Sequence, residues 1–145
     1  MQPRSLAQRL WNDRRIQKSF QILALIGLSA LIFLIFIWGS KPIAIGLFRP
    51  PMDKVAHALL YALMLLLANA AFPKANRLIL FIAIVVVGVL DEIHQLGLRG
   101  RVSDLKDLAA DILGCGLMSL VLHYLSQPSK ARAETHAKAH EEEAS

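Results

Sequence analysis

Residues 88–107 read GVLDEIHQLGLRGRVSDLKD, and this polar segment lies between two long apolar runs. The first run covers residues 78–90, and the second covers residues 108–125 with Asp111 near its start. One ionisable side chain deep in hydrocarbon costs about 2.5–3.5 kcal/mol on insertion scales. A cluster of such side chains between two lipid-compatible runs therefore indicates a polar site at the end of a membrane hairpin.

The composition of the whole chain points to the same class of protein. Hydrophobic residues make up 55% of the 145 residues, and they are collected into long runs that an average soluble domain lacks. The net charge of +5 comes from basic residues at the ends of apolar segments, where they contact lipid headgroups. Nucleic-acid binding is therefore not expected. The single cysteine, Cys115, excludes an intramolecular disulfide framework.

Four apolar segments are long enough to cross the ~30 Å hydrocarbon layer as helices. They cover residues 20–38, 53–72, 78–98 and 103–125, with prolines in the intervening or following segments. The sequence therefore predicts an all-α, polytopic membrane protein built as a four-transmembrane-helix bundle. The expected organisation is a basic segment 1–19, a transmembrane domain 20–125 and a polar, disordered tail 126–145.

Four spans place both termini on the same side of the membrane. The N-terminal segment, the turn at 73–77 and the tail hold ten of the sixteen Lys and Arg residues. Because cytoplasmic loops are enriched in these residues, the distribution favours an N-in, C-in orientation. The start of the second span, the end of the third and the start of the fourth then lie at the outer face.

Each of these three helix ends carries polar residues at helical spacing. In the second span, Asp53, His57 and Tyr61 recur every four residues and share one face, with Lys54 at the rim. In the third span, Glu92 and Gln95 share a face with Gly88, whereas Asp91 and His94 are expected to point either to a neighbouring helix or to the rim.

The fourth span continues this pattern. Asp104, Asp107 and Asp111 lie on one face at its start, and Ser103 is the expected N-cap. Arg101 precedes the helix and is suited to a bidentate pair with a carboxylate or a phosphate. The three polar faces are therefore predicted to converge on one outward-facing pocket.

These residues together resemble a known family. The ordered motifs Asp53-Lys54-x-x-His57-x-x-x-Tyr61, Glu92-x-x-Gln95 and Arg101-x-x-Asp104-x-x-Asp107-x-x-x-Asp111-x-x-Gly114 are similar to those of VanZ-like membrane proteins, over residues 50–120. The resemblance implies a four-helix domain in the bacterial cytoplasmic membrane. The founding member confers resistance to the glycopeptide teicoplanin, but most members are not resistance proteins. The family commonly has Asn where this chain has Asp111, and only a protonated aspartic acid could donate as an amide does.

Several functions are compatible with such a pocket. It could bind an envelope lipid or precursor headgroup, or a glycopeptide-like ligand, and the ligand-binding residues would be Asp53, Lys54, Tyr61, Gln95, Arg101, Asp104, Asp107 and Asp111. It could instead be an enzyme in which His57, oriented by Asp53 or Glu92, is the general base and Glu92 the acid. The charges could also simply lock the helices together or relay protons, and the chain could form a homodimer. Because no HExxH-type spacing is present, neither a metal nor another cofactor is expected.

Overall fold

The computed structural model describes residues 14–38, 52–98 and 104–127. Its helical elements are α2 (Arg14–Phe33), the π-helical η1 that continues it (Leu34–Trp38), α3 (Met52–Ala71), α4 (Arg77–Leu96) and α5 (Leu105–Ser126). Four helices, counting α2 and η1 as one, are long and apolar enough to cross a membrane. The predicted four-span, all-helical membrane fold is therefore confirmed.

The helix boundaries differ from the predicted spans mainly at the N-terminus. Helix α2 begins at Arg14, so part of the segment expected to be a basic leader is helical. A π-helical turn at Leu34–Trp38 ends this span, and the apolar composition gave no signal for it. The expectations for residues 1–13 and for the tail from 128 onward lie outside the described residues.

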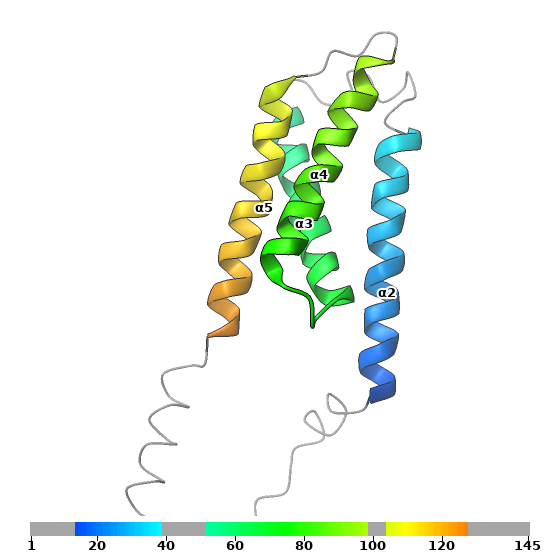
Figure 1. The fold of residues 1–145 in the computed structure, drawn as a ribbon, viewed down its shortest axis with the longest axis vertical. Helices are drawn as coiled ribbons and strands as arrows, with labels where there is room; N and C mark the ends of the chain where they lie inside the picture. The colour runs from blue at the N-terminus through cyan, green and yellow to red at the C-terminus, as the bar shows by residue number, and fades with distance from the viewer. Residues whose placement is uncertain (1–13, 39–51, 99–103, 128–145) are drawn as a thin grey trace, which may run out of the picture.

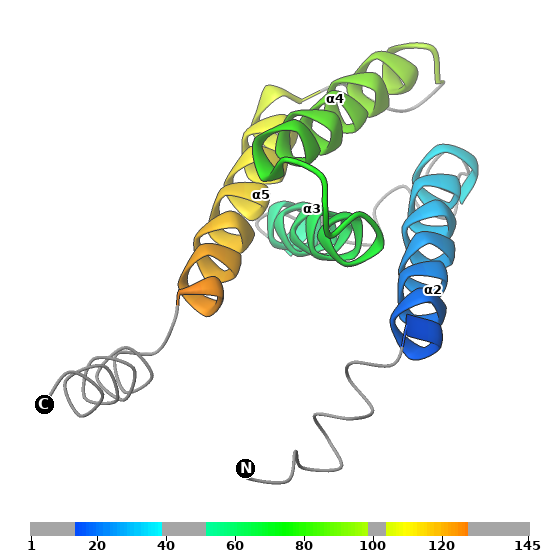
Figure 2. The same ribbon diagram turned by 60° about the horizontal axis from the view of Figure 1, so that its bottom comes forward.

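The helices run alternately up and down, so the start of α2 and the end of α5 lie at the same end of the molecule (Figure 1). Figure 2 shows α3 between α2 on one side and the α4–α5 pair on the other. Helix α3 contacts all three of these helices. Polar residues placed on α3 can therefore reach every other wall of the bundle.

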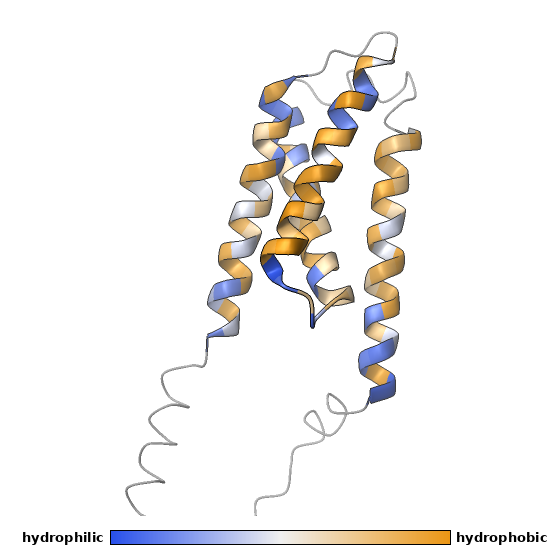
Figure 3. Cartoon of the chain, viewed as in Figure 1, coloured by the Kyte–Doolittle hydropathy of each residue, from blue (hydrophilic) through white to orange (hydrophobic). Residues whose placement is uncertain are grey.

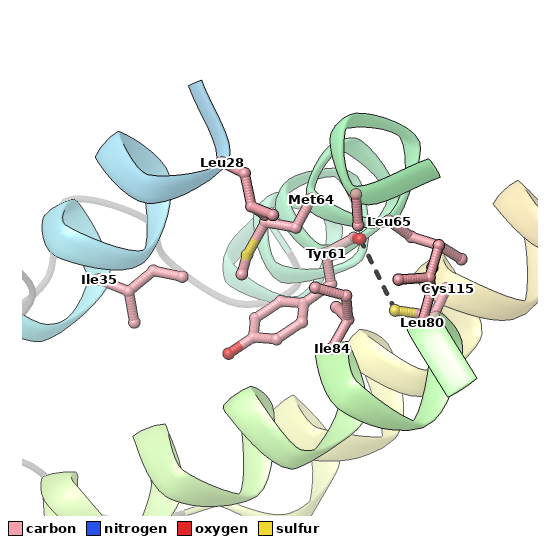
Figure 4. Close-up of a cluster of buried hydrophobic side chains, with 9 residues drawn as sticks. Leu28, Ile35, Tyr61, Met64, Leu65, Leu80, Ile84 and Cys115 are labelled. Carbon is pink, nitrogen blue, oxygen red and sulfur yellow. Dashed lines mark hydrogen bonds between the residues drawn. The ribbon is translucent and has the colours of Figure 1, made fainter. Parts of the chain in front are cut away.

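The buried core forms around α3 (Figure 4). Tyr61, Met64 and Leu65 of α3 have almost no exposed surface. The other residues of this cluster come from all the remaining helices and from the next turn of α3: Leu28, Ile35, Ala68, Leu80, Ile84 and Cys115. The outward faces carry large exposed apolar side chains, as lipid contact requires.

A glycine allows α3 and α5 to approach closely. A methyl group added to Gly114 would overlap the carbonyl group of Ala58 on α3. Because apolar side chains gain little by leaving lipid for a protein interior, close backbone packing through small residues is a main source of helix association in membranes. Gly114 thus sets the distance between the two helices that carry most of the polar residues.

Charge is divided between the two ends of the bundle, and hydrophobic residues dominate between them (Figure 3). All six described acidic residues belong to what we call the carboxylate end: Asp53, Asp91, Glu92, Asp104, Asp107 and Asp111. Five of the seven described Lys and Arg residues belong to the opposite, basic end: Arg14, Arg15, Lys18, Lys74 and Arg77.

Candidate functional site

Lys54 connects the start of α3 to the start of α5. Its ammonium donates to Asp53 at 3.1 Å, to Asp104 at 3.2 Å and to Asp107 at 2.5 Å. An ammonium has three N–H donors, so these three carboxylates match its full capacity. The side chain is 28% exposed and lies at the rim of the bundle. In this arrangement Lys54 neutralises carboxylates.

His57 lies one turn deeper than Lys54 and pairs with α5. Its Nδ1 atom is 3.0 Å from Oδ1 of Asp111, which is completely buried. The sequence predicted Asp53 or Glu92 as the residue that orients His57, and the structure places Asp111 there instead. A carboxylate on Nδ1 fixes the tautomer and leaves Nε2 as the basic nitrogen of a neutral ring.

Tyr61 continues the same face of α3 into the core. The rings of His57 and Tyr61 are nearly parallel, at 7°, with centroids 6.4 Å apart. Figure 4 shows the Tyr61 ring between α3 and α4. Gly88 of α4 leaves room beside it, since an added methyl group there would lie 3.2 Å from Cε1 of Tyr61 and 3.0 Å from Oδ2 of Asp111.

Helix α4 contributes three buried polar residues rather than the two predicted. Glu92 accepts a hydrogen bond from the backbone N–H of Asp104 at 2.9 Å, and Gln95 donates to Asp91 at 3.0 Å. Asp91 was expected to point to a neighbouring helix or to the rim, and it is only 5% exposed. Its spacing of four residues from Gln95 was the signal that could have identified it. His94, by contrast, packs against Phe36 of η1.

The first turn of α5 is capped by Asp104. Its carboxylate accepts from the backbone N–H of Lys106 at 2.9 Å, so the N-cap lies one residue after the predicted Ser103. The amide of Lys106 and the nearby Lys54 ammonium hold the pKa of the Asp104 carboxyl below its ordinary value. This carboxylate therefore stays charged and keeps the start of α5 in place.

Three side-chain oxygens in this region are buried without a hydrogen-bond partner among the described residues. They are Oδ1 of Asp53, the hydroxyl of Tyr61 and Oδ2 of Asp111. Buried polar atoms in proteins are nearly always paired with protein, water or ligand. These atoms indicate that the polar network of the carboxylate end is not complete within the described chain.

The structure thus brings together nine of the ten residues predicted for the site. On α3 and α4 these are Asp53, Lys54, His57, Tyr61, Glu92 and Gln95, and at the start of α5 they are Asp104, Asp107 and Asp111. Arg101 and Ser103 lie outside the described residues. Within the described ranges, no three His, Cys, Asp or Glu side chains are arranged to hold a metal ion.

Comparison with known proteins supports the resemblance seen in the motifs. A search of curated proteins and a search of solved structures each returned no match. The family model described as VanZ/LLP1 matches residues 4–126, which is most of the chain. These residues include all four transmembrane helices and the whole carboxylate end. The chain is therefore a multi-pass membrane protein that belongs to the VanZ/LLP1 family.

Proposed function

We propose that this protein binds the polar headgroup of a cell-envelope lipid, or of a lipid-linked precursor, at its carboxylate end. We further propose that this end faces outward from a bacterial cytoplasmic membrane. The orientation is supported by the basic end, which holds most of the described Lys and Arg residues together with the start of α2 and the end of α5. A ligand at the carboxylate end would therefore come from the outer leaflet.

The observation that carries the proposal is the incomplete polar network in the core. The Tyr61 hydroxyl and Oδ2 of Asp111 are buried without a partner among the described residues. A buried polar group left unpaired costs about 1–3 kcal/mol. A ligand that supplies hydrogen bonds to this network would recover that cost, which is how a membrane-embedded polar site gains affinity.

The charges of the site favour a particular kind of headgroup. Six carboxylates gather at this end, and the ammonium of Lys54 is already surrounded by three of them. The described site is therefore rich in acceptors and suits hydrogen-bond donors such as sugar hydroxyls and amino groups. We assign the phosphate of the same headgroup to Arg101, because it lies only four residues before the first residue of α5 in the sequence and a guanidinium suits a phosphate.

A purely structural clamp accounts for only part of this arrangement. The contacts of Lys54, the pair His57–Asp111 and the bond from Asp104 to Glu92 each join two helical segments. Such pairs can fix the register between helices. A clamp, however, provides no hydrogen-bond partner for the buried Tyr61 hydroxyl or for Oδ2 of Asp111, whereas a bound ligand would provide one.

The test is native mass spectrometry of the purified protein after incubation with a lipid extract of bacterial envelopes. We expect a retained lipid with a hydroxyl- or amine-bearing headgroup, and weaker retention in Tyr61→Phe and in Arg101→Ala. Tyr124→Phe is the matched control, because Tyr124 is 77% exposed near the end of α5. Equal retention by the wild type, Tyr61→Phe and Arg101→Ala would remove the proposal.

A second function is favoured by the pair His57–Asp111. A histidine held at Nδ1 by a buried carboxylate is prepared to act as a general base through Nε2. His57 is partly exposed, at 21% of its side chain, so a substrate headgroup can approach it. Hydrolysis or transfer on a lipid-linked substrate that is lost in His57→Gln and retained in His123→Gln would establish this activity. Absence of turnover on the retained lipid would exclude it for that lipid.

A further inference from the structure

Two buried carboxylates lie close to each other on α4 and α5, below the rim of the carboxylate end. Asp91 of α4 is 5% exposed, and Asp111 of α5 has no exposed surface. A methyl group added to Gly88 would lie 3.0 Å from Oδ2 of Asp111, so this oxygen lies against α4. Gly88 and Asp91 are three residues apart and are neighbours on the surface of α4. The charges of Asp91 and Asp111 are close enough to interact.

The described residues provide one compensating cation for this pair. His57 contacts Oδ1 of Asp111 and also acts on the charge of Asp91. The other described groups that act most strongly on the two carboxylates are a neutral amide and further carboxylates. A protonated His57 therefore balances only one of two negative charges. Because a buried charge without compensation is strongly disfavoured, the pair calls for a second cation.

The unused hydrogen-bonding capacity at this level suits a donor. Oδ2 of Asp111 and the Tyr61 hydroxyl are buried without a partner among the described residues. Tyr61 also lies within electrostatic reach of both Asp91 and Asp111. A carboxylate oxygen can only accept hydrogen bonds, and a phenol oxygen can accept as well as donate. A positively charged group with several N–H donors matches both the charge and these acceptors.

The rim shows how this chain holds an ammonium group. Lys54 donates to three carboxylates, which come from α3 and from the start of α5: Asp53, Asp104 and Asp107. One turn deeper, α4 and α5 again present carboxylates, but the described part of the chain places no lysine among them. The ammonium at this deeper level would have to come from a ligand.

A headgroup can reach this level from the rim. Asp91 lies five residues before the last residue of α4, and Asp111 lies six residues after the first residue of α5. At about 1.5 Å per residue, both are within about 9 Å of the ends of their helices. His57 lies between this level and the rim, and its side chain is 21% exposed. An amine on a short flexible headgroup can therefore enter beside His57.

We propose that the headgroup bound at the carboxylate end carries a primary ammonium group, and that Asp91 and Asp111 bind it. This inference rests on the proposed function and names the chemical class of its ligand. One ammonium and a protonated His57 together balance the two carboxylates. A sugar that carries only hydroxyl groups would supply donors but no compensating charge, so it is the poorer ligand.

The test is native mass spectrometry of the full-length protein with equal amounts of phosphatidylethanolamine and its N-acetyl derivative, both with the same acyl chains. Both lipids carry a phosphate, but only the first carries an ammonium group. We expect the wild type to retain phosphatidylethanolamine at least about tenfold better, the loss typical of one hydrogen bond to a charged group. Phosphatidylcholine, whose quaternary ammonium is charged but has no N–H donor, should also be retained more weakly.

Two variants assign the ammonium to the carboxylates. Asp91→Asn and Asp111→Asn keep the side-chain volume, and each should reduce the preference for phosphatidylethanolamine about tenfold. Asp13→Asn, directly before α2, is the matched control and should leave the preference unchanged. Continued retention of the N-acetyl lipid by the two site variants would show that their headgroup site is still formed.

Three outcomes would overturn the inference. Equal retention of phosphatidylethanolamine and its N-acetyl derivative by the wild type would exclude an ammonium requirement and leave headgroup binding in place. An unchanged preference in both Asp91→Asn and Asp111→Asn would show that these carboxylates do not bind the ammonium. Retention of neither lipid, and of none from an envelope extract, would remove the proposed function together with this inference.

Discussion

His57 of α3 and Asp111 of α5 form a contact of 3.0 Å between Nδ1 and Oδ1, and the Asp111 side chain has no exposed surface. Three positions along α3 and four along α5 separate this contact from the rim, where Lys54 joins the same two helices through Asp107. The α3–α5 interface therefore has two polar levels, and Gly114 provides close backbone packing at the same interface. Each level can be tested separately.

Replacing Asp111 tests what the buried carboxylate supplies. Asp111→Asn keeps the volume and an acceptor oxygen for His57, so the free energy of unfolding should change by less than about 1 kcal/mol. Asp111→Ala removes the acceptor and should cost about 1–3 kcal/mol. Denaturation in detergent mixtures measures both. Combined with His57→Gln in a double-mutant cycle, Asp111→Ala should show coupling of about 0.5–3 kcal/mol. Additive losses would mean that the contact contributes no energy of its own.

Two glycines of α5 provide a matched test of helix packing. Gly114→Ala would push a methyl group into the carbonyl of Ala58 and should lower the unfolding free energy by about 1–3 kcal/mol through overpacking. Gly116→Ala meets nothing within 4 Å and should leave stability unchanged or slightly higher, since alanine favours helix. Thermal unfolding in detergent gives both values. Similar losses of stability at the two positions would indicate that α5 is destabilised by any added methyl group, and not by the overlap with Ala58 in particular.

Acidification should loosen the start of α5. The pKa of Asp104 is lowered in the folded protein, mainly by the amide of Lys106, so its cap contributes stability at pH values above its ordinary pKa of 3.8. That contribution is lost as the pH falls below 3.8 and through the lowered value. The protection of the Lys106 amide, measured as its hydrogen-exchange rate relative to the intrinsic rate at the same pH, should therefore fall at the acid end of this range. In Asp104→Ala the same amide should be unprotected at every pH.

The orientation can be measured with variants that carry one introduced, exposed cysteine. The natural Cys115 is fully buried, so it should not react with a maleimide in the folded protein. With the proposed orientation, Lys106→Cys should react with a membrane-impermeant maleimide in intact cells, and Lys74→Cys only after permeabilisation. The reverse pattern would place the carboxylate end in the cytoplasm and rule out an outer-leaflet ligand.

The sequence alone determined the class of fold and predicted most of the polar residues that gather at the carboxylate end. Long apolar runs fix the number of transmembrane helices, because about twenty such residues are needed to cross the hydrocarbon layer. Helical spacing then fixes which side chains share a face, and this correctly grouped Asp53, His57 and Tyr61 on α3. These inferences depend only on local geometry.

The tertiary structure decided which residues meet across the helices. Periodicity along one helix gives neither its rotation nor its height relative to a neighbour. For this reason His57 was expected beside Asp53 or Glu92, and the structure pairs it with Asp111, one turn deeper than Asp107 on α5. Asp91 was missed for the same reason, since the buried face of α4 is wider than a single stripe. The close approach of α3 and α5 at Gly114 lies at the interface where His57 meets Asp111, and only three-dimensional packing reveals it.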